Sequence, residues 1–264
     1  MRLFNNYRAF LGKELMENLR TKKFLVMICV FLSFAMTSPL LTRFMGEFLA
    51  FMLPGEDEMA MAMANAMGTP TWVDSYIQIY GNLGQIGAIT VLLLFMGIIL
   101  REKRSGTADL VFTKGLQPSA FVLAKFTMAG ILILITVIAS VLIGYIYTLV
   151  LFEYGGNLGH VFLGGLVFGV FMLMMLAIIM LCSAIARSTA ISAVLGFFAF
   201  FFFIVLSAIP VIGVFTPGTL MAGSPIEITL GHTPDRFIIA FISTILITVL
   251  SLLAATKVTA TRQM

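Results

Sequence analysis

The sequence predicts an all-α membrane protein with six transmembrane helices, and three observations support this fold class. Six long apolar stretches, which together make up half of the chain, contain no Asp, Glu, Lys, Arg or His. The mean hydropathy is +1.08 and only 11% of the residues are charged, whereas soluble domains carry about 25%. The charged residues lie between the stretches, with Lys and Arg concentrated in alternate segments.

Each apolar stretch is about long enough to cross a bilayer, which takes roughly 20 residues of helix. We expect the spans at residues 24–42, 84–100, 126–151, 161–186, 188–213 and 237–256, with Arg187 alone between the fourth and the fifth. These spans and their modest loops fill the sequence. We therefore expect residues 1–264 to form a single transmembrane domain without a soluble catalytic domain.

The segment before the first span predicts an amphipathic helix. Its apolar residues recur at spacings of three and four, and the charged residues fall largely on the rest of the helical wheel. A basic run at residues 20–23 follows, so the helix is suited to lie in the membrane interface. The apolar positions are Leu3, Phe4, Tyr7, Phe10, Leu11, Leu15, Met16 and Leu19.

The distribution of charge predicts the orientation. Of the 16 Lys and Arg residues, 14 lie before the first span, in the loop 101–125, at Arg187 or after the last span. The positive-inside rule therefore predicts that both termini are cytoplasmic in a multi-pass protein of the plasma membrane. Eight of the 12 acidic residues fall on the opposite side. This separation explains the net charge of +4 without a nucleic-acid partner, and membrane lipid is the expected surrounding.

Sulfur-containing residues raise two questions. Cys29 and Cys182 both lie inside apolar spans, where packing is the expected role rather than a structural disulfide. In the outer segment 43–83, methionines alternate in an Ala-Met run, and thioethers at this spacing can bind Cu(I). Ala and Met also favour helices, so a mobile or membrane-touching helix is the alternative. The methionines concerned are Met59, Met61, Met63 and Met67.

Small and aromatic residues in the fourth and fifth spans point to close packing. Gly165 and Gly169 are four residues apart, a spacing that lets two helices approach closely. The partner helix can belong to the same subunit or to a second one. The phenylalanines of residues 197–203 face either lipid or a lateral opening of the bundle.

The cytoplasmic segment between the second and third spans carries the most informative polar sequence. Asp109 is expected in the first turn of a short helix, where the helix dipole favours an acid, and Gly115 ends it. Leu110, Val111 and Phe112 supply apolar side chains. A two-turn helix of this kind fits a groove on another protein. A connector that lies on the lipid surface is the alternative.

This segment resembles the corresponding loop of ATP-binding cassette (ABC) exporter permeases of the ABC-2 type, which have the type V exporter fold. The order of span, loop and span is similar throughout the chain, and Lys13, Glu14 and Leu15 also resemble the start of such permeases. Residues 114–118 depart from the pattern, because many relatives place Pro directly after the Lys. The matching positions are Glu102, Gly106, Thr107, Leu110, Val111, Pro118 and Lys125.

The resemblance implies a complex of two permease chains, identical or related, with two cytoplasmic ABC ATPase subunits. The loop would carry a cytoplasmic coupling helix that receives the ATPase motion. The sequence has no G-x-x-x-x-G-K-[ST] phosphate loop, so ATP and Mg would be bound by the ATPase partner. We expect this chain to be no enzyme by itself and to bind no cofactor or metal. The residues expected to couple are Glu102, Gly106, Thr107, Leu110, Val111 and Phe112.

The segment 210–235, between the fifth and sixth spans, is rich in Pro and Gly, so one continuous helix is not expected there. In similar permeases this region forms short helices that dip into the outer leaflet and close the pathway. Glu227 is the acid nearest this candidate outer gate. A solvated residue in an ordinary loop is the alternative.

Three functions remain open at this stage. The first is an ABC exporter permease that moves an amphipathic, peptide, drug or lipid-like substrate outward. The second is a membrane scaffold or sensor subunit that transports nothing. The third is an ion-coupled secondary transporter, which the absence of ionisable residues within the spans disfavours.

Overall fold

The computed structural model describes residues 2–52 (side chains from Phe10 onward), 68–113, 115–209, 213, 215–233 and 237–261. This part of the chain consists of helices and their connections, with no β-strand. It contains six helices that are long and apolar enough to cross a membrane. The predicted fold class, an all-α membrane protein with six candidate transmembrane helices, is therefore confirmed.

The chain begins with a helix at one end of the bundle and continues through the six long helices. In order, the elements are α1 (Arg2–Arg20), α2 (Lys23–Arg43), α3 (Met45–Met52), α5 (Trp72–Asn82), the π-helix η1 (Leu83–Gly87), α6 (Ala88–Phe95), α7 (Leu100–Arg104), α8 (Thr107–Thr113), α9 (Pro118–Phe152), α10 (Leu158–Ile185), α11 (Thr189–Ser207), the 3₁₀ helix η2 (Pro217–Met221), α13 (Gly223–Thr229) and α14 (Phe237–Thr261).

Local sequence accounts for where several of these helices begin. The backbone N–H and the hydroxyl of Thr71 both donate to the Asp74 carboxylate, at 2.8 and 2.6 Å, which closes the first turn of α5. Pro118 is the first residue of α9, where its missing N–H costs nothing. The Ser188 hydroxyl accepts from Ile191 N–H and caps α11 immediately after α10 has ended.

The second span differs from its predicted boundaries. It runs from Trp72 to Arg104 as α5, η1, α6 and α7, so the prediction that it starts at residue 84 is wrong. The extra turns contain polar residues, and these find partners on α2: Asn82 donates to the Ser38 hydroxyl at 2.9 Å, and Gln78 accepts from Thr42 at 2.7 Å. Side-chain hydrogen bonds between helices allow polar residues to extend an otherwise apolar span.

The other spans differ less from their predicted boundaries. Four helices match their predicted spans closely or extend them, whereas α11 ends at Ser207 although the apolar stretch continues to residue 213. Residues 210–212 lie outside the described residues, as do Lys114 and the Met-rich run that was weighed as a Cu(I) site or a helix, Met59, Met61, Met63 and Met67.

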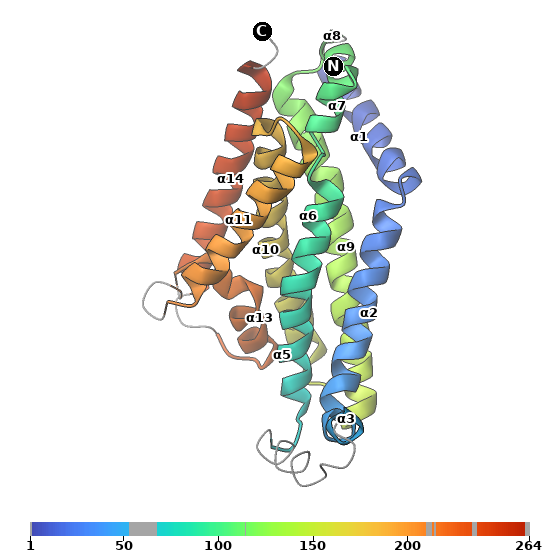
Figure 1. Cartoon of the computed structure of the whole chain (residues 1–264), viewed down its shortest axis with the longest axis vertical. Coiled ribbons are helices and arrows are strands. Elements are labelled where there is room, and N and C mark those ends of the chain that lie inside the picture. The colour runs from blue at the N-terminus through green and yellow to red at the C-terminus, as the bar shows by residue number, and fades with distance from the viewer. Residues whose placement is uncertain are drawn as a thin grey trace.

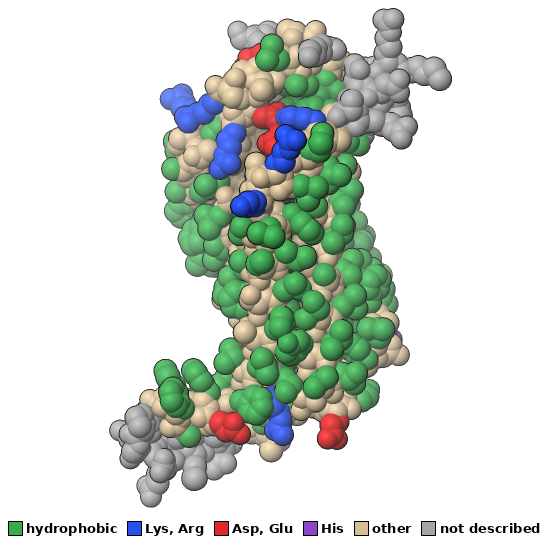
Figure 2. Space-filling model, turned by 90° about the vertical axis from the view of Figure 1, so that its right-hand side faces the viewer, with side chains coloured by type: hydrophobic (Ala, Val, Ile, Leu, Met, Phe, Trp, Pro, Cys, Tyr) green, Lys and Arg blue, Asp and Glu red, His purple; other side chains and the backbone are tan. Residues whose placement is uncertain are grey.

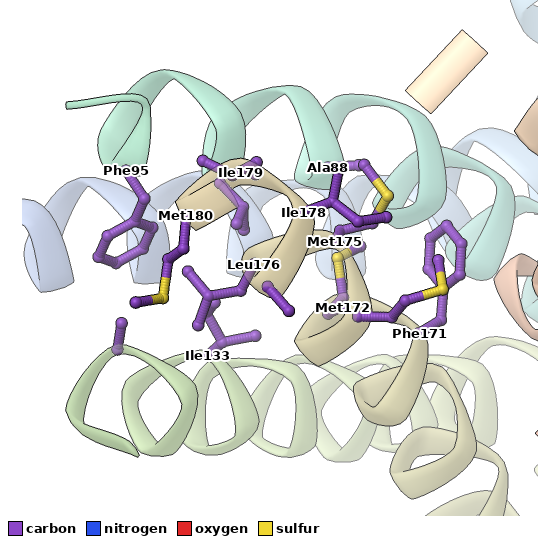
Figure 3. Close-up of a cluster of buried hydrophobic side chains, with 14 of the residues drawn as sticks. Ala88, Phe95, Ile133, Phe171, Met172, Met175, Leu176, Ile178, Ile179 and Met180 are labelled. Carbon is purple, nitrogen blue, oxygen red and sulfur yellow. The ribbon is translucent and has the colours of Figure 1, made fainter. Parts of the chain in front are cut away.

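The centre of the bundle is α10, which contacts α9, α14, α13, α11 and α6 (Figure 1). Its methionines and branched side chains fill the space between the neighbouring helices. In Figure 3, Leu176 of α10 lies near Ile133 of α9, and Met180 lies near Phe95 of α6. Flexible thioethers suit such irregular gaps. A Cβ added to Gly165 or Gly169 would meet a side chain of α9, so these glycines serve packing within the chain.

The helices α11 and α14 are far less buried than the central helix α10. Of the 18 most apolar consecutive residues in α11 and in α14, only 17% are buried, whereas the corresponding share in α10 is 67%. Large apolar side chains such as Phe198, Phe202 and Ile238 are exposed on them. This surface requires lipid or another protein chain as its surrounding.

The two ends of the bundle differ in charge, and we name them accordingly. The basic end contains α1, α7, α8 and the start of α9, and the N- and C-terminal ends of the chain lie there together (Figure 1). On the face in Figure 2, Lys and Arg side chains gather towards that end. The acidic end contains α3 and the start of α5, with Glu47 and Asp74. If all six candidate spans in the described residues cross a membrane, α1 and the end of α14 lie on the same side of it.

Candidate functional site at the basic end

Five charged side chains from three elements meet at the basic end. We call them the ion cluster: Lys13, Glu14 and Glu17 of α1, Glu102 of α7 and Lys125 of α9. Lys125 is only 2% exposed, and its Nζ lies 2.9 Å from Glu14 Oε1 and 2.9 Å from Glu102 Oε1. Lys13 Nζ lies 2.6 Å from the same Glu102 oxygen. Glu102 therefore bridges the two lysines.

Aromatic rings hold the elements that carry the cluster. Phe10 of α1 packs on Phe121 of α9, with ring centroids 5.5 Å apart, and Phe112 of α8 packs on the same ring at 5.3 Å. Lys125 lies one helical turn after Phe121, and its Nζ is 5.1 Å from that ring. The cation therefore sits between carboxylates and an aromatic face, both of which stabilise a positive charge.

Burial makes this pairing necessary. An unpaired charge in such a place costs several kcal/mol, and two carboxylates around one ammonium offset that cost. Burial by itself would lower the pKa of Lys13, but the hydrogen bond to Glu102 and the charges of Glu14 and Glu102 hold that pKa above its usual value. Lys13 therefore stays protonated throughout the physiological range. With all five groups ionised, the cluster carries a net charge of −1.

Three carboxylates of the ion cluster also have the spacing of a metal site. Glu14, Glu17 and Glu102 each offer an oxygen, and these oxygens lie within 4.8 Å of one another. Both lysine ammonium groups already contact them, so each cation position is taken by the chain itself. This arrangement is not evidence for a bound metal, and the expectation that the chain binds no metal stays a prediction.

The ion cluster is connected to a short exposed helix. Gly106 and Gly115 have φ values of +72° and +87°, which glycine adopts readily, and they bracket α8 as the sequence predicted. The hydroxyl of Thr107 donates to the backbone carbonyl of Glu102 at 3.3 Å. A movement of α8 would therefore act directly on the residue that bridges the two lysines.

The apolar residues of α8 divide into two groups. Leu110 is 63% exposed. Val111 and Phe112 are half-buried, and Phe112 packs against Phe121 of the same chain. Of the apolar residues expected to face a partner, Leu110 is the one left largely uncovered, while Phe112 fixes α8 to α9.

A second connection leads from the cluster to the central helix. The backbone N–H groups of Ile99 and Leu100, where α7 begins, both donate to the Ser183 hydroxyl of α10, at 3.1 and 3.2 Å. Arg104, at the end of α7, donates to the backbone carbonyl of Arg187. The start of α7 is thus bound to the end of α10, and the end of α7 is bound to the connection that follows α10.

The residue predicted at the outer gate lies apart from this site. Glu227 is an exposed residue of α13 at the far end of the bundle. The buried face of α13 consists instead of Ser224, Pro225 and Thr229, and the Thr229 hydroxyl lies 3.3 Å from that of Tyr80 in α5. Packing of α13 against the bundle agrees with a short helix that returns to it, but its contacts are made by residues that sequence analysis did not select.

Sequence analysis also missed the ion cluster as a unit. The sequence pattern marks Lys13, Glu14, Glu102 and Lys125 only as separate positions of resemblance, and it does not mark Glu17. One signal was available: each of the five lies next to or within an apolar segment, and the signs are nearly balanced. Only the fold brings α1, α7 and α9 to the same place.

In the comparisons with known proteins, no protein-family model and no curated protein matches the chain.

Proposed function

We propose that the chain is the membrane-spanning permease subunit of an ABC exporter, driven by a separate ATPase subunit, that moves an amphipathic, peptide, drug or lipid-like substrate outward. The observation that carries this proposal is the ion cluster, which joins the N-terminal helix, α7 and the span α9 into one unit, and to which the exposed helix α8 is linked by the hydrogen bond from Thr107 to the Glu102 carbonyl. The resemblance in the order of spans, loops and motifs supports the same function.

The first support is mechanical. A docked ATPase can drive a membrane subunit only if the docking helix does not slide freely on the bundle. Three ion pairs, Lys13–Glu102, Lys125–Glu14 and Lys125–Glu102, join α1, α7 and α9, and the Phe112–Phe121 contact joins α8 to α9. The Ser183 hydroxyl continues this connection into α10, which is the centre of the bundle. A displacement of α8 would therefore reach the core helix.

The second support is the exposed side chain of Leu110. Groove-binding helices insert apolar side chains into their partners, and an uncovered leucine on a charged end of the molecule needs such a partner. A connector on the lipid surface would also cover it. However, the buried ion cluster directly behind α8 is more than a passive connector requires.

The third support concerns the energy source. Among the described residues, the buried charged side chains are Glu14, Glu102 and Lys125. Glu102 and Lys125 belong to the candidate spans Trp72–Arg104 and Pro118–Phe152, but they lie near the ends of these helices at the basic end and are paired with each other. Ion-coupled carriers keep an ionisable residue within the membrane to bind the driving ion. ATP and Mg bound by a partner subunit would supply the energy instead. The exposed faces of α11 and α14 leave room for a second permease chain.

Co-purification with an ATPase subunit tests the proposal. The tagged chain is expressed in its native host, extracted in mild detergent and assayed for ATP hydrolysis in the recovered complex. We expect an ATPase subunit to accompany the chain. Leu110→Arg should reduce both its recovery and the hydrolysis by at least about tenfold, because the change places an unpaired charge in an apolar groove.

Leu19→Arg is the matched control, since Leu19 is also about half exposed but lies on α1. It should leave recovery and hydrolysis near wild type. Recovery of the chain without any ATP-hydrolysing partner would contradict the proposal. Equal behaviour of the two arginine variants would remove α8 as the docking helix.

A further inference from the structure

A cavity of about 430 Å³ opens at the acidic end, where α2 ends, α3 begins and α5 starts. Its volume lies in the range of small-ligand sites. Both ends of the chain and the ion cluster lie at the other end of the bundle, so the cavity is separate from the candidate coupling site. Polar and charged side chains line much of it, including Arg43, Glu47, Asp74 and Gln78.

The charged side chains that line the cavity, Arg43, Glu47 and Asp74, are exposed at its rim. Arg43 ends α2 and Glu47 lies in the first turn of α3, yet no ion pair joins them, nor does one join Arg43 to Asp74, among the residues described here. Asp74 accepts hydrogen bonds from the backbone N–H and the hydroxyl of Thr71. One cationic and two anionic groups thus face a shared space. This is the complement of a ligand that carries both signs of charge.

The surroundings of the cavity indicate headgroup depth in a membrane. Trp72 begins α5, and its ring lies 5.2 Å from that of Tyr154 and 6.1 Å from that of Tyr76. Trp and Tyr are enriched at the level of lipid headgroups. The neighbouring helix α3 has no buried residue and exposes Phe48 and Phe51, as a helix lying at a membrane surface does.

We propose that this cavity binds a phosphate–ammonium zwitterion, with the phosphate at Arg43 and the ammonium group at Glu47 and Asp74. Arginine forms strong charge-assisted hydrogen bonds to phosphate, and carboxylates do the same for an ammonium group. A phospholipid headgroup of the phosphatidylethanolamine class has this chemistry, as does soluble phosphoethanolamine. The proposal is independent of the exporter function, because it concerns another end of the molecule and requires no ATPase.

Lipid binding to the purified full chain tests the proposal. The chain in an uncharged maltoside detergent is titrated with phosphatidylethanolamine, phosphatidylglycerol or soluble phosphoethanolamine. Retained lipid is counted by native mass spectrometry, and the fluorescence of Trp72, the one tryptophan of the sequence, is followed in parallel. We expect phosphatidylethanolamine to bind more tightly than phosphatidylglycerol, which lacks the ammonium group.

The variants separate the two charges of the ligand. Arg43→Gln should weaken phosphatidylethanolamine binding by at least about fivefold, as expected for the loss of a charge-assisted contact of about 1 kcal/mol. Glu47→Gln should reduce the preference over phosphatidylglycerol, because Asp74 is then the one carboxylate left for the ammonium group. Glu153→Gln removes an exposed acid at the same end, outside the cavity, and should bind like wild type.

The soluble ligand identifies the source of the zwitterion. Binding of phosphatidylethanolamine that soluble phosphoethanolamine does not displace supports a lipid site, and displacement at similar affinity supports a soluble ligand of the same chemistry. Equal binding of both lipids to the wild-type chain would overturn the proposal. So would Arg43→Gln and Glu47→Gln variants that bind like Glu153→Gln, because the lipid would then adhere to the apolar surface only.

Discussion

At the scale of single residues, Lys125 has the most demanding surroundings in the described part of the chain. Its ammonium group is almost fully buried at the start of a long apolar helix, with carboxylates from α1 and α7 around it. Removal of one partner from a buried ion pair costs about 3–5 kcal/mol, because the other charge stays buried. The stability of the basic end should therefore depend on this residue.

We predict that Lys125→Met lowers the free energy of unfolding by about 3 kcal/mol, since Glu14 and Glu102 lose their shared cation. The measurement is the thermal midpoint of the detergent-solubilised chain, followed by Trp72 fluorescence. Lys257→Met, at an exposed lysine of the same end, is the control and should shift the midpoint little. Equal midpoints for the two variants would show that the ion cluster does not stabilise the fold.

Lys13 leads to a prediction about pH. Its pKa in the folded chain lies above the usual 10.5, so the folded state holds this proton more tightly than the unfolded state does. The resulting stabilisation is complete below the unfolded pKa and is lost as the pH rises through the folded one. The difference in thermal midpoint between wild type and Lys13→Met should therefore stay constant from about pH 6 to about pH 9. A difference that falls steadily across this range would contradict the pairing.

At the scale of elements, the attachment of α13 to the bundle depends on a close backbone approach. A Cβ added to Gly164 of α10 would lie 2.5 Å from the Thr229 hydroxyl and 2.7 Å from the Pro225 carbonyl oxygen. Both contacts are shorter than atoms tolerate. The absence of a side chain at Gly164 thus lets α13 lie against α10 and reach Tyr80 of α5.

We predict that Gly164→Ala displaces α13 and lowers the free energy of unfolding by about 1–3 kcal/mol, the usual cost of overpacking. Gly81→Ala in α5 is the matched control, because nothing lies within 4 Å of its added Cβ. It should be neutral or stabilise the helix by up to about 1 kcal/mol. Hydrogen exchange in residues 223–229 should increase only in Gly164→Ala, and unchanged exchange there would rule out the close contact.

At the scale of the whole molecule, charge separates the two ends of the bundle and predicts its orientation. Ser105 lies exposed at the basic end, next to α8, and Glu153 lies exposed at the opposite end, between α9 and α10. The positive-inside rule places the first of these in the cytoplasm and the second outside.

Cysteine labelling in sealed cells checks this orientation. In a chain whose Cys29 and Cys182 are replaced by Ala, a membrane-impermeant maleimide should label Glu153→Cys and leave Ser105→Cys unlabelled until the membrane is opened. Labelling of Ser105→Cys in intact cells would reverse the predicted topology. It would also place α8 out of reach of a cytoplasmic ATPase.

The sequence alone determined the class of the protein, the number of candidate spans and the separation of charge. These properties follow from composition and local order, because a bilayer excludes charged residues over about 20 positions whatever the tertiary contacts are. The bracketing of α8 by Gly106 and Gly115 was predictable for the same reason, since the left-handed backbone conformation is a local property.

The tertiary structure alone decided which polar residues are buried and which side chains they contact. Asn82 and Gln78 looked like loop residues, and only the hydrogen bonds to α2 show that they belong to a span. Lys13, Glu102 and Lys125 are far apart in the sequence, and one ion cluster forms from them only because α1, α7 and α9 converge. Partners of this kind depend on how helices pack, and no local pattern of residues contains that information.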